Sequence, residues 1–419
     1  MFRVLILLLS VFISNCFSQV KLLIPMESTQ TNHLKAYGIA YRHLLAGKEL
    51  DWLLNYRGGS FLFNYSPSLE EECKSNKVYY ELLNGTETAQ VYAFVQEENN
   101  NTELVRLEKA ARIAVYVPPN ALPWDDAVQL ALDYAGIPYE KLWDEEVLSG
   151  KLKGFDWIHL HHEDFTGQYG KFFATFSTSD WYLIQKKTNE DMAKKLGYKK
   201  VSQLKRDVVK KLNEYIANGG FLFTMCSATD TYDISLATEN TDICAEIYDG
   251  DPLDTKANEK LDYSECIAFE NFKIILDPLV YEYSNIDITD ELFYIGQYND
   301  NFKLVDFQAK IDPVPTMLTQ CHTSTIKGFM GQTSGFKKEF LKKNITILGM
   351  NEGTNWVRYI HGNYGKGTFT LLGGHDPEDY QHLVGAPATN LDEYPNSPGY
   401  RLILNNVLFP AAKKKKMKT

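Results

Sequence analysis

The sequence predicts an α/β protein with a mostly parallel sheet, and three observations favour this class. Short apolar segments with strand character alternate with amphipathic helical segments over most of the chain. The helix predicted over 201–217 ends at Gly219-Gly220 and passes directly into the apolar strand 221–225. A second apolar strand, 367–372, appears late in the chain. Apolar strands of this kind are typical of a parallel sheet that helices cover on both faces.

The individual elements follow from the spacing of apolar residues and from the residues that stop helices. Helices are predicted over 29–46, 123–134, 201–217 and 399–408, with Gly47 and Gly136 as stop signals for the first two. Strands are predicted over 20–26, 50–56, 89–95, 111–117, 155–160, 221–225, 345–350 and 367–372. Between about 229 and 344 the period is lost, which predicts an insertion or a β-richer subdomain.

The first residues have the pattern of an export signal. Arg3 precedes an apolar run, 4–13, which is too short for a membrane span of about 20 residues. We therefore expect a signal peptide over 1–18 and a periplasmic or secreted protein, with lipid attachment at Cys16 as the second choice. No later segment approaches a membrane span.

The rest of the chain divides into three parts. We expect an N-terminal α/β segment over 19–108, a larger domain over 109–409 that contains the insertion of about 229–344, and a basic tail over 410–419.

Charge and cysteine content narrow the classes of partner. The chain of 419 residues carries 43 Lys and Arg against 54 Asp and Glu, a net charge of −11, which disfavours nucleic-acid binding. Five cysteines remain beyond the signal peptide, and their spacing assigns no disulfide pairing. We predict no cofactor and no metal, and a small-molecule ligand of amide or carbohydrate type; no protein partner is indicated.

Two strand ends carry reactive side chains. Cys226 comes where the strand 221–225 stops before small residues, and His375 follows the strand 367–372, with Glu378 three residues later. Ligands bind outside the carboxyl ends of parallel strands, where a thiol gains from nearby helix N-terminal amides. A Cys, a His and a carboxylate are the nucleophile, base and orienting group of acyl transfer. Cys226, His375 and Glu378 are therefore the predicted catalytic residues.

This arrangement resembles the class I glutamine amidotransferase superfamily, in which an elbow Cys pairs with the His and Glu of a late His-Pro-Glu motif. The resemblance covers about 111–409 and implies a flavodoxin-like parallel sheet. The form Gly373-Gly374-His375-Asp376-Pro377-Glu378 is closer to the trehalose-utilisation (ThuA-like) branch. The chain departs from the Gly-x-Cys-x-Gly elbow, because Thr224 and Ala228 occupy the glycine positions.

The whole chain also resembles exported bacterial proteins of the Bacteroidetes type that are commonly labelled asparagine synthetase B. Glutamine-dependent asparagine synthetases have a Cys directly after the initiator Met and a Ser-Gly-Gly-x-Asp-Ser loop for ATP. Here residue 2 is Phe2, that loop is missing, and export would deny the protein ATP. The residues therefore do not predict ATP-dependent asparagine synthesis. The segments that carry the resemblance are 36–41, 225–231, 312–317 and 397–406.

Further side chains are candidates for ligand binding. Arg57, in a Gly-rich turn, could bind an anionic group or simply belong to a hairpin, and we also assign Ser227, His161 and Asp376 to substrate binding. The segment 159–164 (HLHHED) ends a strand at the same sheet edge. Strand alternation directs His159 and His161 one way and His162 the other, so at most two of them could share a metal without help, and a polar pocket rim is favoured. Asp249-Gly250-Asp251 suggests calcium, with a solvated loop as the favoured alternative.

Two functions from different classes remain open. One is an exported cysteine-dependent amidase or hydrolase that acts through Cys226, His375 and Glu378. The other is a non-catalytic ligand-binding or scaffold protein of the cell envelope that keeps the same cleft.

Overall fold

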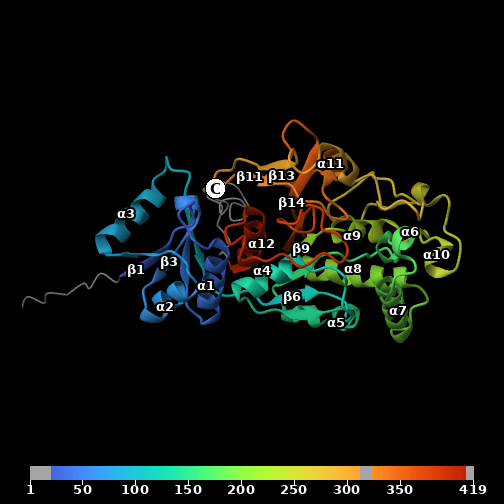
Figure 1. Ribbon diagram of the computed structural model, residues 1–419, viewed down its shortest axis with the longest axis horizontal. Helices are drawn as coiled ribbons and strands as arrows, with labels where there is room; N and C mark the ends of the chain where they lie inside the picture. The colour runs from blue at the N-terminus through green and yellow to red at the C-terminus, as the bar shows by residue number, and fades with distance from the viewer. Residues whose placement is uncertain (1–19, 312–322, 412–419) are drawn as a thin grey trace, which may run out of the picture.

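The computed structural model describes residues 20–311 and 323–411 and contains two β-sheets (Figure 1). The predicted signal peptide, Cys16 and all but the first two residues of the basic tail lie outside the described residues. Within the described ranges, no helix is long and apolar enough to cross a membrane.

The N-terminal part is a five-stranded sheet in the order β4-β1-β3-β2-β5, with every neighbouring pair antiparallel. Helix α1 packs between this sheet and two helices of the larger part, α4 (Ala127–Ala135) and α12 (Pro398–Leu408), so that one apolar core runs through both parts. The elements are β1 (Lys21–Ile24), α1 (His33–Leu45), β2 (Leu50–Leu54), β3 (Ser60–Asn64), α2 (Pro67–Ser75), β4 (Glu81–Leu83), α3 (Gly85–Gln96) and β5 (Glu103–Leu107).

The strand predicted over 89–95 is wrong, because this segment belongs to helix α3. The Asn84 side chain accepts hydrogen bonds from the backbone N–H groups of Thr86 and Glu87, and the Glu87 carboxylate accepts one from the N–H of Asn84. This reciprocal capping box stabilises a helix start. It outweighs the strand preference of the valine and aromatic residues in the segment.

The larger part contains a ten-stranded mixed sheet, with nine strands in the order β11-β10-β13-β14-β15-β9-β8-β6-β7 and β12 paired to β14. Strands β15, β9, β8, β6 and β7 are parallel, whereas the pairs from β11 to β15 and the β12–β14 pair are antiparallel. The α/β class is thus confirmed, and the sheet is mixed instead of mostly parallel. The strands are β6 (Ile113–Tyr116), β7 (Glu140–Leu142), β8 (Trp157–Leu160), β9 (Phe221–Met225), β10 (Asn301–Leu304), β11 (Thr325–Lys327), β12 (Phe336–Lys337), β13 (Thr346–Met350), β14 (Trp356–Tyr364) and β15 (Gly367–Leu372).

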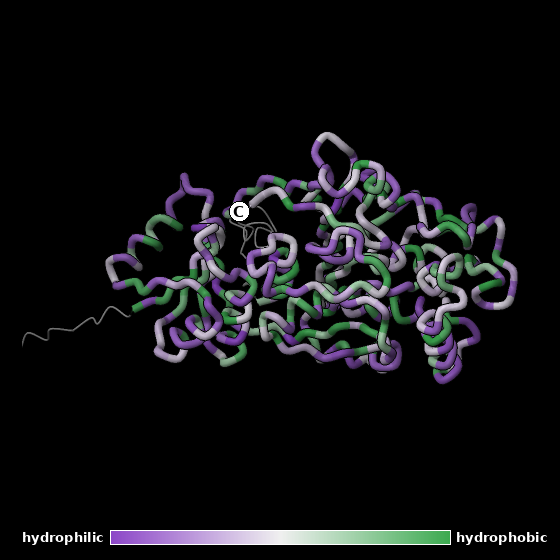
Figure 2. Tube along the Cα trace, viewed as in Figure 1, coloured by the Kyte–Doolittle hydropathy of each residue, from purple (hydrophilic) through white to green (hydrophobic). Residues whose placement is uncertain are grey.

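Helices cover both faces of the parallel strands, and alternate strand residues enter two separate cores. Hydrophobic stretches follow the central strands, and the outlying helix α7 is mostly hydrophilic (Figure 2). Helices α4 and α12 pack on one face, and α8 with α9 on the other. The helices are α4 (Ala127–Ala135), α5 (Asp144–Leu148), α6 (Phe173–Phe176), α7 (Asp180–Lys195), α8 (Val201–Ala217), α9 (Ala228–Ala237), α10 (Glu246–Asp249), α11 (Thr289–Ile295) and α12 (Pro398–Leu408).

The region expected as a β-richer insertion has little regular structure in its described residues. Helix α9 continues directly from β9, and after it come the short helices α10 and α11, the strands β10, β11 and β12, and long loops. Register pairing confirms that the ends of β8, β9 and β15 share one edge, because Leu160 pairs with Thr224 and Leu372 with Met225. Cys226 and His375 follow this edge.

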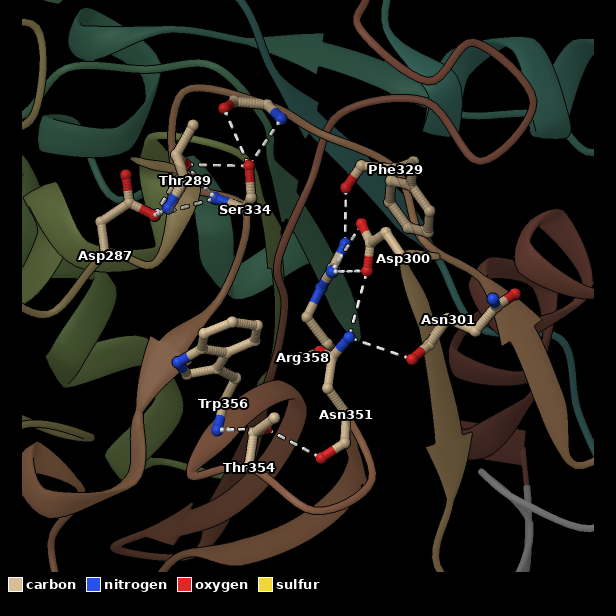
Figure 3. A network of polar contacts seen from close by, with 11 residues as sticks. Asp287, Thr289, Asp300, Asn301, Phe329, Ser334, Asn351, Thr354, Trp356 and Arg358 are labelled. Atoms are coloured by element: carbon tan, nitrogen blue, oxygen red, sulfur yellow. Dashed lines mark hydrogen bonds and ion pairs between the residues drawn. The ribbon is translucent and has the colours of Figure 1, made fainter. Parts of the chain in front are cut away.

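A buried ion pair fixes the loop 328–335 against the sheet (Figure 3). The guanidinium of Arg358, on β14, contacts the Asp300 carboxylate at 2.8 Å and donates to the Phe329 carbonyl at 2.6 Å. At the other end of the loop, the Ser334 N–H donates to Asp287 at 3.1 Å. Because both ends are held, the residues between them have a defined position beside β9.

Candidate functional site

Cys226 occupies a strained turn between β9 and α9. Its φ is +53°, in the left-handed region that non-glycine residues rarely adopt. The Cys226 N–H donates to the Gly374 carbonyl at 3.1 Å, and the Ala228 N–H donates to the His161 carbonyl at 3.0 Å. These bonds join the turn to the loops after β15 and β8. The elbow therefore forms although Thr224 and Ala228 replace the two glycines.

The sulfur of Cys226 lies among backbone donors. The Gln332 N–H donates to Sγ at 3.3 Å, from the loop that Arg358 anchors. Burial raises the pKa of the thiol to about 11, and the N–H groups of Gln332, Ser227 and Thr333 oppose this rise. Cys226 is 2% exposed. At neutral pH the thiol of the free protein is thus protonated and covered.

A histidine cluster lies at the same sheet edge. It comprises His159, His161, His162, His375 and His382, and the rings of His375 and His382 stack with centroids 3.6 Å apart. The rings of His161 and His375 are 4.4 Å apart, and those of His162 and His375 are 5.4 Å apart. Strand β8 with the loop after it and the loop between β15 and α12 thus converge.

Asp126 supports one side of this cluster. It caps α4 by accepting the N–H groups of Val128 and Gln129, and its Oδ1 lies 3.2 Å from Nδ1 of His161 and 3.4 Å from Nε2 of His159. Burial by itself would raise the pKa of Asp126, but His159 and His161 hold it well below 3.8. Asp126 is therefore a buried carboxylate that faces two imidazoles.

Several ring nitrogens of the cluster have no hydrogen-bond partner among the described residues. They are Nε2 of His161, Nδ1 of His162 and both nitrogens of His375 and of His382. Burial lowers the pKa of His162 and of His375 well below 6.5, and the neighbouring histidines lower both further. His162 and His375 are thus neutral at pH 7.

Strand alternation predicted the direction of the His162 side chain incorrectly. Strand β8 ends at Leu160, so His161 and His162 lie beyond the strand, where alternation does not apply. Ligand atoms of His161, His162 and His375 lie within 4.8 Å of one another. His159 and His161 contact each other at 3.3 Å, as the alternation indicated.

A pocket of about 700 Å³ opens beside the cluster, at the ends of β6 and β7. His162, Asp125, Asp126 and Trp124 are among its lining residues, and Cys226 is not. The pocket lies where β6 separates β7 from β8, the point of strand reversal at which open α/β sheets bind ligands.

The predicted partner of His375 lies elsewhere. Burial raises the pKa of Glu378, and a hydrogen bond with Ser397 opposes this rise. Neither ring nitrogen of His375 has a partner among the described residues. The hydrogen bond from a ring N–H of His375 to the Glu378 carboxylate that a triad requires is therefore not formed here. The catalytic roles of Cys226, His375 and Glu378 stay a prediction.

The predicted binding residues have separate surroundings. Arg57 belongs to the N-terminal sheet region, where Glu27 and Glu81 bind its guanidinium at 2.6 and 2.7 Å and hold its pKa above the ordinary value. Ser227 is buried and donates to the Glu163 carbonyl at 3.4 Å. The Asp376 carboxylate accepts hydrogen bonds from the Glu378 N–H and from the hydroxyls of Thr389 and Tyr400. Of the four, His161, Ser227 and Asp376 lie at the sheet edge and Arg57 does not.

Lys200 lies among the carboxylates that suggested a calcium site. The Lys200 ammonium contacts Asp242 and Asp251 at 2.5 Å and Asp249 at 3.0 Å. The Lys200 ammonium therefore compensates the negative charge of these carboxylates.

Sequence pattern did not single out four residues that contribute to this region: Asp126, Asp230, Gln332 and His382. Asp126 lies near the start of the predicted helix 123–134, and Asp230 lies at the start of the segment of about 229–344, where the period is lost. Gln332 and His382 lie in loops without periodicity, so no pattern singled them out.

Comparisons with known proteins give no family. No family model matches the chain, and no curated protein matches it. Among solved structures, it is similar to cytoplasmic protein STM1381 from Salmonella typhimurium LT2, at 13% identity over 72% of this chain and 99% of that one, with a TM-score of 0.35. It is also similar to cytoplasmic protein STM3548 from Salmonella typhimurium, at 11% identity over 72% of this chain and 100% of that one, with a TM-score of 0.34. A third similar structure is the exo-β-1,4-mannosidase Op5Man5 from Opitutaceae bacterium strain TAV5, at 10% identity over 73% of this chain and 37% of that one, with a TM-score of 0.28. At such TM-scores the likeness indicates no function.

Proposed function

We propose that the chain is an exported cysteine-dependent amidase or related hydrolase with a class I amidotransferase-like α/β domain. The order β7-β6-β8-β9-β15 supports this plan, because numbering these strands along the chain gives the flavodoxin-like order 2-1-3-4-5. The signal-like residues 1–18 support export. The left-handed Cys226 at the strand-to-helix turn carries the proposal, because strain of this kind persists where surrounding contacts enforce it and clusters at active sites.

In the proposed reaction, Sγ of Cys226 attacks the carbonyl carbon of a small amide or ester. The thiol proton leaves to a nearby base, the amine or alcohol departs with a proton, and water then hydrolyses the thioester and restores the thiol. The backbone N–H groups of Ser227 and Thr333 are close enough to influence the thiol, and they are the candidate donors to the oxyanion.

Asp230 is the base that we favour. It lies on the first turn of α9, its charge raises the pKa of the Cys226 thiol, and its Oδ1 accepts a hydrogen bond from Thr333 at 2.9 Å. Oδ2 has no partner among the described residues. Burial raises the pKa of Asp230 to about 7, near the value that suits a general base at neutral pH. His375 with Glu378 is the second assignment of the base.

A non-catalytic ligand-binding protein is the second candidate function. The covered thiol of Cys226 and its raised pKa favour it, as does a pocket that Cys226 does not line.

The rate of hydrolysis of p-nitrophenyl acetate against pH tests the proposal. Asp230 must be deprotonated to accept the thiol proton, so we expect kcat/KM to rise with pH through about 7 and then to level off. Asp230→Asn should lower kcat/KM by about 10²–10⁴-fold and remove this inflection. Asp191→Asn, an exposed acid on α7, is the control.

Two outcomes would contradict this account. If His375→Asn removed the inflection and Asp230→Asn kept it, His375 would be the base. If the wild-type chain hydrolysed neither p-nitrophenyl esters nor p-nitroanilides, the ligand-binding function would stand instead.

A further inference from the structure

We propose that His161, His162 and His375 bind a divalent transition-metal ion of the zinc type through the ring nitrogens that lack partners. The inference goes beyond the proposed function and does not depend on it, because the base favoured there is Asp230. Imidazole nitrogen is a preferred ligand of Zn²⁺, and three protein ligands leave a fourth position for water or a ligand.

The first support is the set of unpartnered nitrogens. His161 is 1% exposed and His375 is 4% exposed, and buried polar atoms in native proteins nearly always have a partner. Three side chains from two different loops nevertheless direct ligand atoms to within 4.8 Å of one another. Zn–N bonds are about 2.0–2.1 Å long, so small side-chain rotations would bring all three nitrogens onto one ion.

The second support is the contact between Asp126 and His161. Oδ1 of Asp126 lies 3.2 Å from Nδ1 of His161, which leaves Nε2 as the available nitrogen. Metal-bound histidines almost always donate their other ring N–H to a carboxylate, a carbonyl or water, which fixes the tautomer and the ring orientation. Asp126 is itself fixed as the cap of α4. His161 is thus held in the tautomer that a metal requires.

Two neighbouring groups of ligand type, His159 and Asp376, are already engaged in hydrogen bonds. His159 contacts the Phe223 carbonyl through Nδ1 and His161 through Nε2, so it supports the site from outside. Asp376 accepts three hydrogen bonds, and His382 contacts Asp125 at 3.3 Å. In the described part of the chain, the group of Asp125, Asp376 and His382 is also close together and also has unpartnered atoms. The group of His161, His162 and His375 is favoured because it offers three imidazoles, the ligand type that Zn²⁺ prefers.

The pocket gives the proposed ion a route to solvent. His162 belongs both to the three-histidine group and to the lining of the 700 Å³ pocket. An ion there would have its fourth position available to water or to a small ligand with oxygen or nitrogen donors. The site is thus of the open type and not of the closed structural type.

Metal analysis of the purified mature protein tests the inference. After incubation with ZnSO₄ and gel filtration, we expect one zinc per chain and a higher Tm than after treatment with a chelator. Co²⁺ should give visible d–d bands of a low-symmetry, nitrogen-rich site. His162→Gln and His375→Gln should each weaken zinc binding by more than the roughly 10–100-fold typical of residues that only support a ligand.

The controls separate this site from the others. His43→Gln, on α1, should bind one zinc like the wild type, and so should Cys226→Ser, which tests the proposed function separately. His382→Gln, which alters the neighbouring group of His382, Asp125 and Asp376, should also bind one zinc like the wild type. Wild-type protein without stoichiometric zinc, or unchanged affinity in His162→Gln and His375→Gln with circular dichroism like the wild type, would overturn the inference.

Discussion

Replacing Arg358 with Met should lower the free energy of unfolding by about 3–5 kcal/mol. Arg358 and Asp300 are fully buried, and the substitution leaves the Asp300 carboxylate without its cation in the interior. The loop 328–335 also loses the hydrogen bond from Arg358 to the Phe329 carbonyl (Figure 3). Because this loop directs the Gln332 N–H to the Cys226 sulfur, we expect the substitution to affect the elbow as well.

Urea unfolding followed by circular dichroism measures this effect. Arg112→Met is the matched control, because the Arg112 side chain is 61% exposed and its pair with Asp156 should contribute only about 0–1 kcal/mol. Combining Arg358→Met with Asp300→Asn should recover part of the loss, because the unpaired charge is then gone. A change below about 1 kcal/mol in the single variant would show that the ion pair does not hold the loop.

Replacing Cys226 with Ala should abolish the hydrolysis of esters and amides while the fold is retained. The nucleophile is lost, so kcat/KM should fall by at least about 10³-fold, as removal of a catalytic nucleophile does in other hydrolases. The thiol is buried, so we also expect a loss of roughly 1 kcal/mol in stability from the small cavity. Steady-state kinetics and thermal unfolding of the same preparation measure both effects.

Cys266→Ala provides the comparison for this prediction. Cys266 is also buried, and its thiol donates to the Asp233 carbonyl at 3.3 Å, away from the left-handed turn. It should lose stability to a similar degree and keep full turnover. Equal turnover in Cys226→Ala and in the wild type would exclude Cys226 as the nucleophile.

The strands at the sheet edge were predictable from sequence because apolar residues dominate them. The segments 155–160, 221–225 and 367–372 correspond to β8, β9 and β15, and helix α8 has the predicted bounds. Strand β14 was not predicted, because Arg358, His361 and Asn363 interrupt its apolar pattern. In the antiparallel half of the sheet, β13 corresponds to the predicted strand 345–350, whereas β10, β11, β12 and β14 were not predicted.

Only those residues of the candidate site that follow from local sequence pattern were predictable. Cys226 and His375 were found because each directly follows an apolar strand. Their environments depend on contacts between residues far apart in sequence, such as Gln332 with Cys226 and Asp126 with His161. The position at which β8 ends also matters for the site. A strand that continued from Leu160 through His162 would turn the side chains of His161 and His162 to opposite faces.

Mass spectrometry of the protein quenched in acid during p-nitrophenyl acetate hydrolysis tests the central claim most directly. A cysteine nucleophile forms a thioester, so wild-type protein should gain the mass of one acetyl group, and peptide mapping should place it on Cys226. Asp230→Asn should accumulate this species more slowly, and Cys226→Ala should not form it. Turnover without an acetylated intermediate, or acetylation confined to other residues, would contradict the account.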